Sequence, residues 1–300
     1  MEPTRDLRGI VTVLNTPFTA KDELDLDSVR RHVEYAVGAG VHGFLVPALA
    51  AEVTKLTQDE RLTLLTTVVK AVAGRCPVIA GVYAPDCDSR ARLAAEYTEI
   101  GASGVLVSIP FETEEDFSRQ IADVAAVGMP FLMIQDWSPN DYGIPISVFE
   151  RLAEQVPSFK SVKIEVASSG MKYTEVLRRT AGRLHVAGGW AVGQMIEGLD
   201  RGVHAFMPTA LHEIYVEIYR RYTAGDREGA RSLHCELLPV LSFTNQHLDV
   251  SIHFFKHLLH RQGVYSTPRV REPIATFDEY HRRHAEYLLE YSVQLIDSLR

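Results

Sequence analysis

Lys163 is the residue whose neighbours in the sequence point most directly to chemistry. It lies in the run SVKIE, residues 161–165, between the β-branched residues Val162 and Ile164. Side chains alternate between the two faces of a β-strand, so Lys163 points away from the face that carries these neighbours. If Val162 and Ile164 pack outward, Lys163 faces the interior, where loss of hydration favours a neutral amine that attacks carbonyl carbon. This placement would meet the physical requirement for a Schiff-base lysine.

Position alone also allows a structural interpretation of Lys163. A lysine at a strand end can extend along apolar surface to reach water, or it can form an ion pair with Glu165. An ion pair would keep the amine charged and would oppose its action as a nucleophile.

Three further side chains are candidates for proton transfer beside this lysine. Glu165 follows Lys163 by two residues, which places both on one strand face with their Cα atoms roughly 6.5–7 Å apart. Asp136 and Tyr142 belong to the segment MIQDWSPNDYG, which follows another apolar run. A helix cap or a solvated turn is the alternative role for these last two residues.

Eight short β-branched apolar runs, separated by amphipathic stretches, provide the framework for these residues. The runs cover residues 9–15, 43–47, 77–82, 104–109, 130–135, 161–165, 184–187 and 203–207, and helical patterns include residues 26–39, 58–73, 89–100 and 147–155. Eight strand–helix repeats with right-handed crossovers close most simply into a parallel barrel. We therefore predict an α/β fold, a (β/α)8 TIM barrel. An open doubly wound sheet is the rival, but no glycine-rich nucleotide motif follows the first run.

About 90 residues follow the eighth run, more than one closing helix needs. Helical patterns cover residues 211–222, 227–241, 247–261 and 277–298. No glycine- and serine-rich linker separates them from the preceding part. We expect the barrel to occupy residues 1–224, and residues 225–300 to form a C-terminal helical extension packed on it.

The composition narrows the classes of partner and compartment. The chain has 300 residues, of which 46% are hydrophobic and 23% charged, and its net charge of −8 disfavours nucleic acid as a partner. No uninterrupted run of 18 apolar residues is present, so no membrane partner is expected. The three cysteines are odd in number and lack metal-ligand spacing, so a disulfide framework is not expected and a reducing cytoplasm is the expected compartment. Neither a cofactor nor a metal is predicted.

Several motifs in their order along the chain resemble the dihydrodipicolinate synthase and N-acetylneuraminate lyase superfamily of class I aldolases. VLNTPF resembles its first strand and turn, ALAAEVTKLTQDER its G-T-T-G-E segment, SVKIE its lysine strand, and FFKHLLHRQGVYSTPRVREP its C-terminal helix and tail. The resemblance implies that Lys163 forms an imine with the substrate and that Glu52 is structural. It also implies that Gly188 or Gly189 lets substrate approach the backbone, and that the chain forms a homo-oligomer, a dimer or tetramer.

The chain departs from the family pattern at two places. Leu49 and Ala50 stand where the family has paired hydroxyl residues that bind a carboxylate, so only their backbone N–H groups remain as donors. Ile134 or Gln135 stands where the family has a tyrosine that relays protons. Neither of those two side chains transfers a proton, so another group must do so.

The predicted function is that of a lyase. A small 2-oxo acid or aldehyde forms a Schiff base with Lys163 and undergoes aldol cleavage, aldol addition or dehydration. Tyr83 and Phe111 follow strand ends and are candidates for the pocket wall, and Trp137 either lines the pocket or packs against other side chains. The alternative, suggested by the missing hydroxyl and tyrosine residues, is a catalytically retired barrel that binds a small metabolite or acts as a scaffold.

Overall fold

The computed structural model describes residues 7–299, except for the side chains of residues 190 and 191. Within this range eight parallel strands pair in chain order and close into a barrel. The strands are β1 (Gly9–Val13), β2 (Gly43–Leu45), β3 (Val78–Val82), β4 (Gly104–Val107), β5 (Leu132–Ser138), β6 (Phe159–Val166), β7 (His185–Gly188) and β8 (Ala205–Phe206). The closed barrel confirms the predicted fold and excludes the open sheet.

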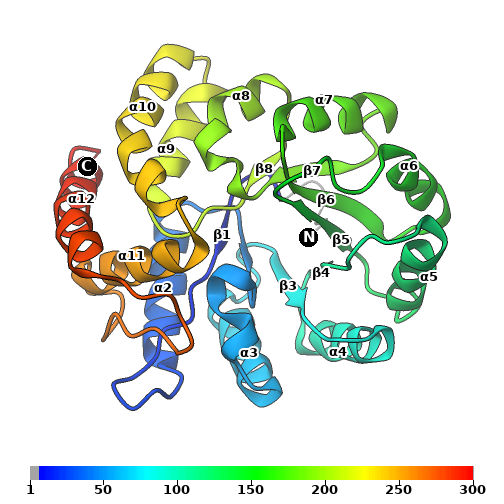
Figure 1. Cartoon of the computed structure of the whole chain (residues 1–300), viewed down its shortest axis with the longest axis horizontal. Coiled ribbons are helices and arrows are strands. Elements are labelled where there is room, and N and C mark those ends of the chain that lie inside the picture. Colours follow the sequence, from blue (N-terminus) through cyan, green and yellow to red (C-terminus); the bar gives the residue numbers. More distant parts are fainter. Residues whose placement is uncertain (1–6, 300) are drawn as a thin grey trace.

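Helices surround the barrel, as Figure 1 shows. They are α2 (Leu26–Ala39), α3 (Gln58–Val72), α4 (Cys87–Ile100), α5 (Glu114–Ala125), α6 (Ile146–Gln155), α7 (Ser169–Arg179), α8 (Met195–Asp200) and α9 (His212–Thr223), with short 3-10 helices η1 (Leu49–Ala51), η2 (Val53–Lys55) and η3 (Trp190–Gln194). Among the described residues, no helix has the length and apolar character needed to span a bilayer.

Side-chain caps explain where several of these helices begin. Thr57 precedes α3 and accepts a hydrogen bond from the Glu60 N–H, while the Glu60 carboxylate accepts one from the Thr57 N–H. Asp25 and Asp86 cap α2 and α4 in the same way through their carboxylates. Such caps satisfy N–H groups that have no partner inside the helix, so these loops end at fixed points.

Strand alternation divides the buried apolar residues into two groups. One group lies between the strands and the helices and includes Val162 and Ile164. The other lies inside the barrel and is listed here: Leu7, Val11, Val13, Leu45, Ile79, Leu106, Phe131, Met133, Ala187, Ala205 and Met207. The barrel interior is therefore a packed apolar core, and any polar side chain that points into it stands out.

The chain continues after the barrel into α10 (Arg227–Thr244), α11 (Leu248–Arg261) and α12 (Glu279–Asp297). These helices lie together on one side of the barrel, coloured yellow to red in Figure 1. Helix α10 packs against α9, and α11 packs against η1 in the loop after β2. The extension thus reaches the carboxyl end of the strands.

A buried ion pair joins this extension to the barrel. Glu52, between η1 and η2, pairs with Lys256 of α11, and both side chains are fully buried. Burial lowers the pKa of Lys256 to about 8, although the Glu52 carboxylate opposes the shift. Glu52 also accepts a hydrogen bond from the Arg271 N–H at 3.0 Å and lies 3.4 Å from the Lys55 amine. These contacts agree with a structural role for Glu52.

Removing the lysine of this pair should destabilise the protein strongly. We expect Lys256→Met to lower the free energy of unfolding by about 3 kcal/mol, because Glu52 keeps its charge in a buried place with one partner fewer. Urea denaturation measures this change. As a control, Arg231→Met removes the exposed partner of Glu228 on α10 and should cause a change too small to resolve. Equal effects of the two substitutions would contradict the assignment.

Candidate functional site

Lys163 faces the interior of the barrel. In β6 it pairs in register with Gln135 of β5 and Ala187 of β7. Its neighbours Val162 and Ile164 pack on the opposite face, against the helices. The lysine is 6% exposed, and it lines a cavity of about 1300 Å³ at the carboxyl end of the strands. The orientation predicted from strand alternation is confirmed.

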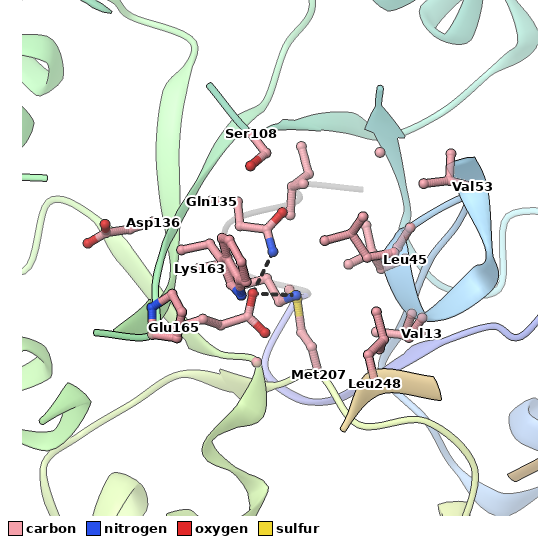
Figure 2. A pocket seen from close by; sticks show the side chains of 18 of the residues that line it. Val13, Leu45, Val53, Ser108, Gln135, Asp136, Lys163, Glu165, Met207 and Leu248 are labelled. Atoms are coloured by element: carbon pink, nitrogen blue, oxygen red, sulfur yellow. Dashed lines mark hydrogen bonds and ion pairs between the residues drawn. The ribbon is translucent and has the colours of Figure 1, made fainter. Parts of the chain in front are cut away.

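The Lys163 amine meets a carboxylate and an amide inside the barrel. The Lys163 Nζ atom lies 3.0 Å from Glu165 Oε2, and both side chains are more than nine-tenths buried. Gln135 Nε2 donates a hydrogen bond to the same carboxylate oxygen at 2.5 Å. Figure 2 shows the three groups converging from two adjacent strands. The ion pair foreseen as an alternative for Glu165 therefore exists, but it leaves the amine beside open space.

Gly189 provides part of that space. A Cβ atom at this position would lie 2.0 Å from Glu165 Oε1 and 2.5 Å from Lys163 Cε, which is closer than atoms can approach. Only glycine therefore fits beside the ion pair. Gly188 pairs with Ile164 in the sheet, so of the two glycines named above it is Gly189 that lines the cavity.

The turn that carries Leu49 and Ala50 forms another part of the cavity wall. The Asn15 side chain donates to the Ala50 carbonyl at 2.7 Å, and Thr16 Oγ1 donates to the Ala51 carbonyl at 2.6 Å. Within residues 7–299, the N–H groups of Leu49 and Ala50 have no acceptor. Because the two side chains are aliphatic, these N–H groups are the donors that the turn offers to a ligand.

The Asp136 carboxylate lies apart from the Lys163 amine, which does not support its predicted role in proton transfer. It follows Gln135 in β5, so its side chain lies on the opposite strand face and points away from Lys163 in Figure 2. Its carboxylate forms a fully buried ion pair with Lys172 of α7, at 2.5 Å, and accepts the Ile144 N–H at 2.9 Å. Burial raises the pKa of Asp136, while Lys172 opposes the shift. Asp136 holds a loop in place.

Tyr142 lies on that loop at the rim of the cavity. Its hydroxyl donates to Glu175 of α7 at 2.9 Å, and the Lys172 amine lies 4.5 Å from the centre of its ring. Burial, followed by the bond to Glu175, raises the pKa of the Tyr142 hydroxyl to about 12. The hydroxyl is thus engaged by α7, which does not support the predicted role in proton transfer.

Three more of the residues named from the sequence line the cavity, and several lining residues were not anticipated. Tyr83, Phe111 and Trp137 line the cavity, each at the end of a strand. Gln135, not Ile134, faces the lumen, because Ile134 is buried against the helices. Sequence reasoning missed the apolar lining residues Val13, Leu45, Leu106, Met207 and Leu248. For the four residues that lie in strand runs, alternation along the run indicates which side chains face the lumen. Their position along the barrel axis depends on the register between strands, and Leu248 lies in α11.

Comparison with known proteins places the chain among lyases of this barrel type. Residues 6–292 match the Dihydrodipicolinate synthetase family. The chain is 27% identical to 4-hydroxy-tetrahydrodipicolinate synthase 2 of Halalkalibacterium halodurans, covering 95% of this chain and 98% of that protein. It is 30% identical to 4-hydroxy-tetrahydrodipicolinate synthase of Moorella thermoacetica, covering 77% and 80%.

A solved structure agrees with the observed fold. The crystal structure of dihydrodipicolinate synthase from Rhodopseudomonas palustris superposes with a TM-score of 0.86 at 22% identity, covering 97% of this chain and 99% of that one. The family match extends over nearly the whole chain, from before β1 into α12. The chain therefore belongs to the dihydrodipicolinate synthetase family of lyases.

Proposed function

We propose that Lys163 forms a Schiff base with a small 2-oxo acid or aldehyde, and that the protein cleaves, forms or dehydrates at the adjacent carbon. The observation that carries this proposal is a buried amine in the barrel lumen, 3.0 Å from a carboxylate and open to a cavity. The family membership of the chain supports the same chemistry.

Glu165 resolves the difficulty that a charged lysine is not a nucleophile. A proton passes from the Lys163 amine to the Glu165 carboxylate, which leaves a neutral amine next to a neutral acid. The amine attacks the carbonyl carbon to form a carbinolamine. Glu165 then returns its proton to the departing hydroxyl, so the ammonium and the carbonyl compound yield a protonated imine and water. The ion pair is thus the resting state of a proton shuttle.

The protonated imine next acts as an electron sink. It stabilises the carbanion-like transition state that forms when a bond at the adjacent carbon breaks or is made. Gln135 holds the Glu165 carboxylate through its amide and cannot itself transfer a proton. Glu165 of β6 is therefore the group we assign to proton transfer, in place of the tyrosine that the family pattern has on β5.

The N–H groups of Leu49 and Ala50 are assigned to the carboxylate of a 2-oxo acid. They are the donors that remain, because the hydroxyl side chains of the family pattern are absent. Each hydrogen bond to a charged group that is lost in this way costs about 1.5–3 kcal/mol. An aldehyde, which carries no carboxylate, avoids this cost. We therefore keep both substrate classes. We also propose that the chain forms a homodimer or homotetramer and works in the cytoplasm, on the strength of family membership alone.

A second candidate is a retired barrel that binds a metabolite without turnover. The Lys163–Glu165 ion pair favours it, because a paired lysine retains its proton. Thermal-shift measurements separate the two candidates. Binding that persists in Lys163→Ala, combined with no turnover by the parent protein, would support the retired barrel.

The imine can be trapped and located. We expect borohydride reduction in the presence of pyruvate to add one pyruvate-derived group to the protein, on Lys163, as measured by intact mass and peptide mapping. Lys163→Ala should give no adduct. Lys160→Ala is the matched control, because Lys160 lies on the same strand, and it should be labelled like the parent. The proposal fails if the parent gives no adduct across a panel of 2-oxo acids and aldehydes.

The role of Glu165 is tested by removing its proton while keeping its shape. We expect Glu165→Gln to slow formation of the trapped adduct by roughly 10²–10⁴-fold, the usual contribution of a general acid–base group. The measurement is the rate of adduct formation by mass spectrometry. Glu154→Gln changes an exposed glutamate of α6 and should leave the rate unchanged. An equal or faster rate in Glu165→Gln would show that the carboxylate only restrains the lysine.

A further inference from the structure

The wall around the Lys163 amine is apolar on the side away from Glu165. Val13, Leu45, Leu106 and Met207 belong to the interior core of the barrel, and each is at most 5% exposed. All four also line the cavity. In Figure 2 Val13 and Leu45 lie on the far side of the cavity from Glu165, and Met207 lies between them and the Lys163–Glu165 pair. A group attached to the imine carbon on that side meets hydrocarbon.

The apolar wall continues outward from the barrel. Leu241 of α10 and Leu248 and Phe255 of α11 line the same cavity, together with Val53 of η2. Figure 2 shows Leu248 next to Val13, with Val53 beyond Leu45. The C-terminal extension therefore prolongs the hydrophobic surface that begins at the strand ends.

Cations for a second carboxylate are scarce along this path. Among the described residues that line the cavity, the basic ones are Lys163, Arg90 and His247. Lys163 is used by the imine. Arg90 donates to the carbonyls of Ala84 and Pro85 and to the Gln120 side chain. A buried carboxylate without a cation is strongly disfavoured.

The third basic residue lies far out on the cavity wall, and the acidic residues on that wall oppose an anionic substituent. His247 caps α11 by accepting the Asp249 N–H, and its side chain is 63% exposed at the outer end of the cavity. Glu165, Asp141 and Asp249 also line the cavity. Their carboxylates would repel an anionic substituent of the substrate.

Hydroxyl partners for a sugar-like chain are also few. Thr244 is buried and donates to the Val240 carbonyl. Ser108, Ser138 and Thr209 are the other serine or threonine residues close to the strand ends on the cavity wall, and the Ser138 hydroxyl is already bonded to Asp141. A polyol would place several hydroxyl groups against hydrocarbon, and each buried hydroxyl without a partner is costly.

We infer that the substrate carries an apolar substituent, aliphatic or aromatic, on its carbonyl carbon, and not a second carboxylate or a polyol chain. The inference rests on the proposed imine at Lys163. It specifies which carbonyl compounds that imine accepts. The physical cause is transfer of the substituent from water into the apolar wall of strand ends and C-terminal helices.

A pair of acids of equal chain length tests this inference. 2-Oxohexanoate and 2-oxoadipate differ only in whether the far end is a methyl group or a carboxylate, and pyruvate lacks the tail. The concentration that gives half-maximal borohydride trapping on Lys163 is measured for all three with the full-length protein. We expect 2-oxohexanoate to need a concentration at least about tenfold lower than 2-oxoadipate, as is typical of a hydrophobic pocket.

The outcomes separate this inference from the function on which it rests. No adduct with any of the three acids overturns the imine and the inference together. An adduct with pyruvate but no preference for 2-oxohexanoate over 2-oxoadipate overturns the inference alone. Leu248→Arg places a cation on the apolar wall and should move the preference toward 2-oxoadipate, whereas Leu238→Arg, at an exposed position of α10 away from the cavity lining, should keep that of the parent. An unchanged preference in Leu248→Arg, with trapping intact, also contradicts the inference.

Discussion

A lysine amine held out of water must have an anionic partner or lose its proton, and this constraint organises the whole structure. Within residues 7–299 three lysines are buried, Lys163, Lys172 and Lys256, each beside a carboxylate. Two of these pairs lie outside the barrel lumen, where they hold a loop and the C-terminal extension. The pair of Lys163 with Glu165 alone among the three borders open space in the lumen. The interaction that stabilises the scaffold elsewhere is thus placed beside a cavity that can admit a ligand, and our proposal for the function rests on this difference.

The Asp136–Lys172 and Glu52–Lys256 pairs help to position the walls around the Lys163–Glu165 pair. Lys172 draws the segment around Tyr142 and Ile144 onto α7 by donating to both carbonyls, which fixes one rim of the cavity. Lys256 draws α11 onto the loop that contains the Leu49–Ala51 turn, through Glu52. Each pair therefore fixes a different wall around the same amine. Such pairs contribute to a single geometry more than to net stability, because desolvation offsets much of their attraction.

Much of this arrangement could be predicted from the sequence, and the failures have physical reasons. The apolar runs located the strands because a parallel barrel buries both strand faces, and alternation oriented Lys163 correctly. Asp136 was misplaced because the predicted strand ended at Gln135, whereas β5 continues to Ser138, so alternation turns Asp136 outward. The Tyr142 hydroxyl donates to Glu175 of α7, which lies 33 residues further along the chain. Local sequence patterns do not reveal such a contact. To predict which apolar residues line the cavity, one must know how far neighbouring strands are offset along the barrel axis. No single apolar run contains that information.

Lys163 and much of the cavity wall around it come from different parts of the chain. Lys163 and Glu165 belong to a strand of the barrel, whereas Leu241, Leu248 and Phe255 come from helices that follow it. Substitutions in α10 and α11 can therefore reshape the cavity wall while the strand that carries Lys163 remains intact. A laboratory library directed at the inner faces of these helices would vary the wall without altering the Lys163–Glu165 pair.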